Sequence, residues 1–299
     1  MFNNLIDTIG NTPLVLLKNI PGLENKKNNN LFLAKLEGNN PAGSVKDRAA
    51  VSMITGAENK GLIKPGDVLI EATSGNTGIA LAMAAKILGY KMKLIMPENL
   101  SVERRQVMRA FGAELILVSQ STGMEGARDL ALEMGSNRSG IILNQFANDD
   151  NWLAHYENTG LEILRDTKNS LTHFVSAMGT TGTITGVSRR LKESNSKIKV
   201  IGVQPSDGSQ IPGIRKWTEE YIPPIRKKAF IDFIEEVSQS EAEEMARRLA
   251  TEEGIFCGPS GAGALCVAIK IAKNECNARI VFIVCDRGDR YLSTNLFPD

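Results

Sequence analysis

The stretch "VLIEATSGNTGIALAMAAKILGYKMKLIMPE", residues 68–98, decides the fold. It opens with the apolar run "VLIEA", passes through a glycine-rich loop into the helical pattern "TGIALAMAAKILG", and ends in a second apolar run, "KLIMPE". Short apolar runs separated by about 10–15 residues of helical pattern are typical of parallel strands joined by crossover helices. The stretch therefore predicts a strand–helix–strand unit of an α/β protein.

The same alternation continues towards the C-terminus. It repeats as "SVERRQVMRAFG", "ELILV" and "MEGARDLALEMG", and it resumes with the strand "THFVSAMG", the helix "ITGVSRRLKE" and the strand "KVIGVQP". The helix "SEAEEMARRLATEEG" follows, with either Ser238 or Ser240 as its N-cap. We therefore expect two domains, each with a mostly parallel sheet flanked by helices.

Two segments interrupt the alternation. Residues 144–160, "NQFANDDNWLAHYENTG", are rich in asparagine and aspartate, which predicts a loop that opens into a helix and a crossing between domains. Residues 207–228, "DGSQIPGIRKWTEEYIPPIRKK", contain prolines but no clear period, which predicts a long irregular loop. Loops of this length in compact domains are usually functional.

Length and composition narrow the class of protein. The 299 residues suit two domains, and 42% hydrophobic with 23% charged residues is ordinary for a globular protein. The 35 basic and 34 acidic residues nearly cancel, so we expect small-molecule substrates rather than nucleic acid or a membrane surface. The N-terminus lacks a signal-peptide pattern, and the four cysteines form no CxxC pair, so we expect a cytoplasmic protein without a bound metal.

The stretch "NNPAGSVKDRAA", residues 39–50, places a lysine at the start of a helix. Ser44 is a suitable N-cap, and the charge of Asp47 suits the first helical turn. The positive end of the helix dipole, together with any burial, would lower the pKa of Lys46. A lysine that forms a Schiff base must spend time unprotonated near neutral pH, so Lys46 is the candidate nucleophile.

Three glycine-rich loops lie before predicted helices. The loop "EATSGNTGIA", residues 71–80, offers backbone N–H groups and hydroxyls, which fits either a carboxylate or phosphate cradle or a plain helix cap. The loop "SAMGTTGTITG", residues 176–186, is neither a P-loop nor a GxGxxG loop, and it suggests a cofactor held by its phosphate alone. The loop "CGPSGAGA", residues 257–264, places Ser260 at a third helix start, where a plain N-cap is the simplest interpretation.

A reactive lysine, a phosphate cradle and a second anion loop are the parts that pyridoxal phosphate needs for chemistry on an amino acid. With these residues identified, the chain resembles the fold-type II pyridoxal-phosphate enzymes and, within them, the cysteine synthase family. The segments "TIGNTPL", "NPAGSVKDRAA", "EATSGNTGIALA" and "GTTGT" match that family's motifs in the family's order. The details "EGNNPAGSVKDR", "IPGIRKW" and "CDRGDRYLST" are nearer to its B-type branch, the O-acetylserine sulfhydrylase B type, than to its A-type branch.

The resemblance implies a role for each matching residue. Lys46 would be the Schiff-base lysine, and Asn76 would meet the ring hydroxyl of the cofactor. The phosphate would be held by Gly179, Thr180, Thr181, Gly182 and Thr183. The substrate carboxylate would be bound by Thr73, Ser74, Gly75, Thr77 and Gln145. The ring nitrogen would meet Ser260, with Cys285 as the second choice and Asp286 as the third.

The resemblance also implies the reaction and the architecture. O-acetyl-L-serine would lose acetate, and sulfide or thiosulfate would then add to give L-cysteine or S-sulfocysteine. The alternatives are a cystathionine β-synthase-like activity, a threonine/serine dehydratase-like activity, or a non-catalytic binding protein on this fold. The enzyme would be a homodimer, with a smaller domain at residues 40–148 and a larger one at 1–39 plus 149–299. The cofactor would lie in the cleft between these domains.

One position departs from the family pattern. Where a second arginine is expected in "IPGIRRW", this chain has Lys216 beside Arg215. We expect these two cations to attract an anionic sulfur donor such as thiosulfate. Lysine supplies charge but lacks the planar fork of arginine, so the sequence leaves the donor preference open.

Overall fold

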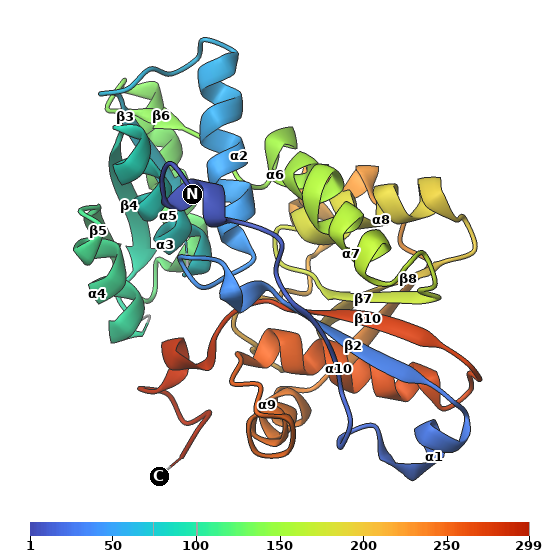
Figure 1. Ribbon diagram of the computed structural model, residues 1–299. Helices are drawn as coiled ribbons and strands as arrows, with labels where there is room; N and C mark the ends of the chain where they lie inside the picture. Colours follow the sequence, from blue (N-terminus) through green and yellow to red (C-terminus); the bar gives the residue numbers. More distant parts are fainter. Residues whose placement is uncertain (74, 100, 299) are drawn as a thin grey trace.

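A computed structural model describes residues 1–73, 75–99 and 101–298 of the chain. Figure 1 shows two separate sheets with helices packed against their faces. The predicted α/β fold with two mostly parallel sheets is confirmed. Within the described residues, no helix is both long enough and apolar enough to cross a bilayer.

The smaller sheet contains the stretch that decides the fold. Its strand order is β5-β4-β3-β6, and every pair is parallel. The strands are β3 (Val68–Ala72), β4 (Lys91–Pro97), β5 (Glu114–Val118) and β6 (Ile141–Ile142). The helices around them are α2 (Lys46–Asn59), α3 (Asn76–Leu88), α4 (Val102–Ala110) and α5 (Gly123–Ser136). One apolar cluster packs α2, α3 and α4 on one face and another packs α5 on the other, which is why these strands are apolar on both sides.

The larger sheet has the order β1-β2-β10-β7-β8-β9, and only its edge pair β1–β2 is antiparallel. Its strands are β1 (Leu14–Leu16), β2 (Leu31–Leu36), β7 (His173–Ala177), β8 (Lys199–Pro205), β9 (Phe233–Val237) and β10 (Arg279–Val284). In Figure 1, α9 (Gln239–Glu253) and α10 (Pro259–Ala272) lie on one side of this sheet, and α7 (Gly160–Asp166) and α8 (Gly182–Ser194) lie on the other. Two apolar clusters fill these two interfaces.

The segments that interrupt the alternation have the local structures that the sequence predicts. After β6 the chain runs through a loop into α6 (Asp149–Ala154), a π-helical turn η3 (His155–Thr159) and α7. Residues 207–228 are irregular except for the short 3-10 helices η4 (Glu219–Tyr221) and η5 (Pro224–Lys228). Of the two serines suggested as N-cap of α9, the structure uses Ser238, which forms a capping box with Glu241.

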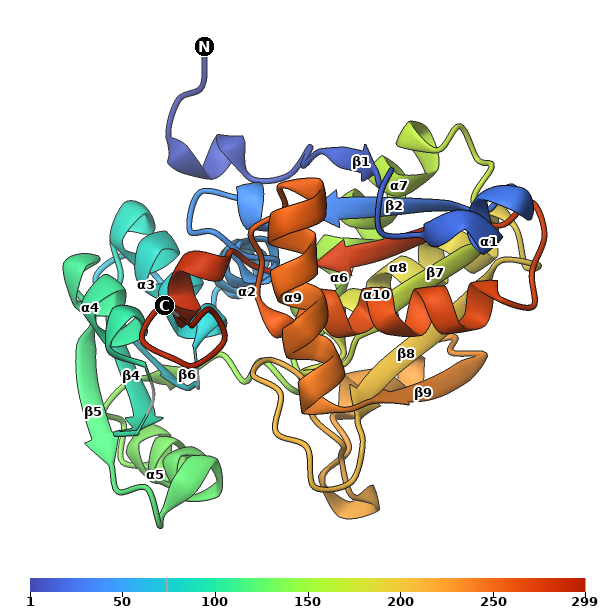
Figure 2. The same ribbon diagram turned by 90° about the horizontal axis from the view of Figure 1, so that it is seen from below.

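The two ends of the chain run back across the molecule. The N-terminal part contains η1 (Leu5–Thr8), α1 (Gly22–Lys27) and η2 (Glu37–Asn39), and the C-terminal part contains η6 (Gly288–Tyr291). Figure 2 shows the C-terminal segment beside α4 of the smaller sheet. There the backbone N–H and the hydroxyl of Ser293 donate to the carboxylate of Glu103 at 2.7 and 2.6 Å.

A buried ionic network, which the sequence analysis did not identify, fixes α2 between the two sheets. The Arg48 guanidinium on α2 donates to the carboxylates of Glu37 and Glu162 at 2.7 Å each, and Lys35 pairs with Glu162 at 2.7 Å. Burial alone would raise the pKa of Glu37, but the charge and hydrogen bonds of Arg48 lower it below its usual value. The network therefore holds the helix whose first residue is Lys46.

Candidate active site

A pocket lies between the two sheets, at the carboxyl ends of their parallel strands. Ligands of open α/β sheets generally bind at such strand ends. Its walls include every described residue that the sequence analysis nominated for substrate or cofactor, apart from the third-choice Asp286. Those lining residues are Lys46, Thr73, Gly75, Asn76, Thr77, Gln145, Gly179, Thr180, Thr181, Gly182, Thr183, Arg215, Lys216, Ser260 and Cys285. Ser74 lies outside the described residues.

Lys46 is the first residue of α2 and reaches the pocket from the helix N-terminus. Its backbone N–H donates to the Ser44 hydroxyl at 3.2 Å, although the N-cap residue itself is Val45 rather than the expected Ser44. Burial lowers the pKa of Lys46, and the nearby Cys285 and Asp286 oppose that shift only in part. The amine is therefore more easily deprotonated than an exposed lysine.

The loop between β7 and α8 forms a narrow cradle at a helix N-terminus. Thr181 has a left-handed backbone with φ of +69°, which turns the chain into α8. A Cβ on Gly182 would lie 2.1 Å from Asn151 Oδ1, and one on Gly179 would lie 2.7 Å from the Gly213 carbonyl oxygen, so both positions need glycine. Among the described residues, nothing hydrogen-bonds the buried Thr181 hydroxyl. A free hydroxyl and backbone N–H groups at a helix start are suited to an anion such as phosphate.

The side chains of this cradle are held from α6 and η3. Thr180 Oγ1 accepts from the Gly182 N–H at 3.3 Å and from Asn151 Nδ2 at 3.4 Å. Thr183 Oγ1 lies 3.4 Å from His155 Nε2. Burial, followed by the charge of Arg48, lowers the pKa of His155 to about 3, so this imidazole is neutral. It can orient the Thr183 hydroxyl without adding charge to the cradle.

The loop before α3 offers a second set of donors on the opposite wall. The Thr73 hydroxyl oxygen accepts the N–H groups of Gly75 and Gly78 at 3.2 and 3.1 Å, which leaves its own proton available. The Thr77 hydroxyl donates to Gln145 Oε1 at 2.8 Å, and Gln145 Nε2 donates to the Ala72 carbonyl at 3.1 Å. Thr73 can thus donate to a carboxylate as it stands, whereas Thr77 must turn away from Gln145 to do so.

Asn76 is fixed by groups behind the pocket wall. Its Nδ2 donates to Asp286 Oδ2 at 2.6 Å, and the Arg290 guanidinium donates to its Oδ1. The Tyr291 hydroxyl donates to the same Asp286 oxygen at 2.6 Å. Of the three side chains considered for the ring nitrogen, Ser260 and Cys285 line the pocket, while Asp286 is engaged with Asn76 and Tyr291.

Ser260 is the second residue of α10 and is only 2% exposed. The N-cap of that helix is Gly258, so the plain-cap interpretation of Ser260 is wrong. Burial raises the pKa of Cys285 to about 11, and Lys46 only partly offsets this, so Cys285 is a neutral thiol. Both candidates therefore present an uncharged group to the pocket.

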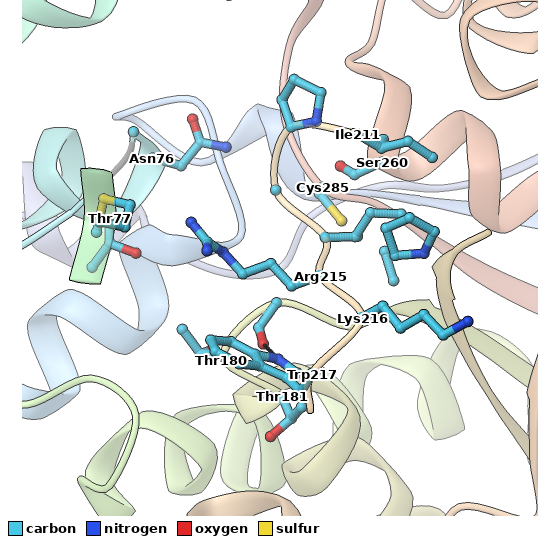
Figure 3. Close-up of a pocket in the computed structure, with 18 of the residues that line it drawn as sticks. Asn76, Thr77, Thr180, Thr181, Ile211, Arg215, Lys216, Trp217, Ser260 and Cys285 are labelled. Carbon is cyan, nitrogen blue, oxygen red and sulfur yellow. Dashed lines mark hydrogen bonds between the residues drawn. The ribbon is translucent and has the colours of Figure 1, made fainter. Parts of the chain in front are cut away.

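The structure does not bring Arg215 and Lys216 together as a pair of free cations. Figure 3 shows Arg215 extending into the pocket and Lys216 pointing away from it. Lys216 Nζ forms ion pairs with Asp207 at 2.6 Å and Glu236 at 2.8 Å, so its charge is offset. The neighbouring Trp217, which the sequence analysis did not nominate, donates its indole N–H to the Gly179 carbonyl at 2.8 Å. This loop has no regular period, so the sequence gives no signal for which of two adjacent side chains faces the pocket.

Comparisons with known proteins agree with this geometry. The family model described as "Pyridoxal-phosphate dependent enzyme" matches residues 5–286. Cysteine synthase B of Pseudomonas aeruginosa is 57% identical over 296 residues, which cover 99% of this chain and 98% of the relative. Cysteine synthase B of Escherichia coli is 58% identical over 297 residues, covering 99% of this chain and 97% of the relative.

A solved structure supports the same assignment. The crystal structure of a cysteine synthase from Entamoeba histolytica superposes with a TM-score of 0.93 at 40% sequence identity, covering 100% of this chain and 91% of the other. The family model, the sequence relatives and the solved structure thus each match nearly the whole chain. The chain therefore belongs to the cysteine synthase family of pyridoxal-phosphate-dependent enzymes.

Proposed function

We propose that this chain makes L-cysteine from O-acetyl-L-serine and sulfide by β-replacement with pyridoxal 5'-phosphate. The observation that carries the proposal is that Lys46, an amine with a lowered pKa, shares one pocket with the anion cradle at Gly179–Thr183. The unpartnered Thr181 hydroxyl, noted among the described residues, and the close-packed Gly182 fit a phosphate group.

The residues of the pocket would have separate roles in the reaction. The cofactor, when bound, supplies an electron sink for negative charge at the substrate α-carbon. Its phosphate would be held by Gly179, Thr180, Thr181, Gly182 and Thr183. Lys46 would hold the cofactor covalently, and its freed amine would then remove the proton from the substrate α-carbon.

Two further contacts would orient the cofactor. Asn76 would meet the ring hydroxyl, because its amide is already fixed by Asp286 and Arg290. Ser260 would meet the ring nitrogen, with Cys285 as the alternative. Because both are uncharged donors or acceptors, the ring would stay a moderate electron sink, which suits elimination at the β-carbon.

The substrate carboxylate would be bound on the opposite wall. Thr73, Gly75, Thr77 and Gln145 surround the N-terminus of α3, whose dipole favours a negative charge. The Thr77 hydroxyl would exchange Gln145 Oε1 for the carboxylate when substrate enters. We therefore expect the loop before α3 to move when the substrate binds. Ser74 remains a proposed member of this set on the strength of the family motif.

We also propose the finer features of the protein. Its domains would be residues 40–148 and residues 1–39 plus 149–299, because all strands of the smaller sheet fall inside the first range. A homodimer would cover exposed apolar side chains of the N-terminal segment such as Phe2, Leu5 and Leu16. The four free cysteines fit a reducing compartment, the cytoplasm. Thiosulfate would serve as a second sulfur donor and give S-sulfocysteine.

Product analysis of the purified holoenzyme tests the activity. With O-acetyl-L-serine and sulfide, we expect L-cysteine and acetate in equal amounts. Cystathionine formed faster from homocysteine than cysteine from sulfide would indicate a cystathionine β-synthase-like enzyme. Keto acid from serine or threonine would indicate a dehydratase-like lyase, and no turnover with a correctly loaded cofactor would indicate a binding protein. Lys46→Ala serves as the inactive control.

A further inference from the structure

One side chain from the C-terminal part of the chain joins the two segments that would hold the cofactor ring. The Arg290 guanidinium on η6 donates through Nη1 to Asn76 Oδ1, at the start of α3. Through Nη2 it donates to the Ala42 carbonyl, in the turn before Lys46. Arg290 is only 8% exposed, so both bonds are shielded from water. A guanidinium can reach both acceptors at once because its N–H groups point in fixed and different directions.

The turn before Lys46 leaves room for this guanidinium. Gly43 has a left-handed backbone with φ of +82°, and a Cβ there would lie 2.6 Å from Arg290 Nη2. The same turn is fixed to the end of β10, because the Val45 N–H donates to the Cys285 carbonyl at 2.8 Å. The positions of Lys46 and Arg290 are therefore set together.

The partners of Asn76 fix the orientation of its amide. A guanidinium has donors and no acceptor, so the atom that faces Arg290 must be Oδ1. Nδ2 donates at 2.6 Å to the Asp286 oxygen that also accepts from the Tyr291 hydroxyl. Nδ2 carries a second N–H, which has no acceptor within the described part of the chain. Figure 3 shows the Asn76 amide nitrogen pointing to the side on which Ser260 lies, so this N–H is available to a ligand in the pocket.

We propose that Arg290 is a positioning residue, which holds Asn76 and the turn before Lys46 together and so directs the free Asn76 N–H at the ring oxygen of the cofactor. Because Asn76 can only donate in this orientation, the ring oxygen would be bound as an acceptor, in its ionised form. A hydrogen bond to a charged oxygen is stronger than one between neutral groups. The inference rests on the proposed function, in which Asn76 lies beside the ring oxygen.

Titration of the apoenzyme with pyridoxal phosphate tests the inference. We expect Arg290→Met, which removes both donors, to raise the Kd for the cofactor about tenfold, or about 1.4 kcal/mol. Arg290→Lys keeps the charge but lacks the fork that reaches both acceptors, so its Kd should rise only about threefold. The matched control is Arg287→Met, because Arg287 belongs to the same segment but is exposed and pairs with Asp289. This control should change the Kd less than about twofold.

Two readouts separate positioning from a general effect on the fold. If Arg290 acts through Asn76, Arg290→Met should change the Kd less than about threefold in an Asn76→Ala background. The absorbance of the holoenzyme reports the ring oxygen, because the ionised form absorbs at longer wavelength than the protonated form. The ratio of the long-wavelength band to the short-wavelength band should fall in Arg290→Met and recover in part in Arg290→Lys.

A tenfold effect of about equal size in both backgrounds, an unchanged absorbance ratio in Arg290→Met, or an equal loss in Arg287→Met would overturn the inference. If the Tm shows that Arg290→Met does not fold, Arg290→Lys in the same two backgrounds decides by the same criteria.

These measurements need no substrate, so they separate the inference from the proposed function. If the variants follow the expected order but the wild-type holoenzyme makes no cysteine, the role of Arg290 stands and the proposed function fails. If the holoenzyme makes cysteine but Arg290→Met binds the cofactor as the wild type does, the proposed function stands and the inference fails.

Discussion

Replacing Gly182 by alanine tests the cradle at its tightest point. The new Cβ would lie 2.1 Å from Asn151 Oδ1, where real contacts essentially never fall below 3.0 Å, so something must move by at least about 0.9 Å. Asn151 is not free to move, because its Nδ2 donates to the Gln145 carbonyl at 2.6 Å. A shift of this size in the cradle would remove hydrogen bonds to the charged phosphate, each of which is worth about 1.5–3 kcal/mol. We therefore expect the Kd for pyridoxal phosphate to rise about 100-fold, or about 2.7 kcal/mol.

The assay is titration of the apoenzyme with cofactor, followed by its absorbance. Asn151→Ala alone loses its amide hydrogen bonds and should weaken binding by at most about tenfold. The double variant Gly182→Ala/Asn151→Ala no longer has the clash, so it should bind the cofactor about as well as Asn151→Ala. Strictly additive effects, or a Gly182→Ala protein with normal affinity, would refute the steric reasoning. The apoenzyme Tm should change little, which separates cofactor loss from unfolding.

Two further predictions concern α2. Lys46→Ala should abolish turnover while the far-ultraviolet circular dichroism and Tm of the apoenzyme stay near the wild-type values, and near-normal kcat would remove Lys46 from the mechanism. Arg48→Met should leave Glu37 buried without its cation and lower stability by about 3–5 kcal/mol, seen as a Tm lower by roughly 6–15 °C at pH 8. Arg48 lowers the pKa of Glu37 in the wild type, so the wild type loses stability as the pH falls towards that pKa. In the variant, burial raises the pKa of Glu37, so the variant gains stability as the pH falls and Glu37 takes up a proton. The Tm difference should thus narrow at pH 5, and a constant difference would argue against a charged Glu37.

The sequence predicted those parts of the molecule that have a strong local signal. The strands at 68–72 and 199–205 and the glycine loops between strands and helices could be identified because buried parallel strands are continuously apolar and helix starts need particular residues. Lys46 could be nominated because its glycine turn and helix start lie next to it in the chain.

The remaining features depend on contacts between distant segments. Arg48, Glu37 and Glu162 look like surface charges in sequence, because charged residues are rarely buried, and only the fold brings them together. Trp217 and Gly179 lie 38 positions apart, and only the fold brings the indole N–H to the Gly179 carbonyl. Lys216 was expected to act with its neighbour Arg215, but adjacent side chains on an irregular loop can point in opposite directions.

Borohydride reduction of the purified holoenzyme, followed by peptide mass spectrometry, tests the central claim most directly. The claim is that Lys46 holds pyridoxal phosphate at the start of α2, facing the cradle of residues 179–183. We expect a visible absorption band that disappears on reduction, and a phosphopyridoxyl group on the peptide that contains Lys46. A label on another lysine, or a protein that binds the cofactor without any reducible bond, would contradict the account.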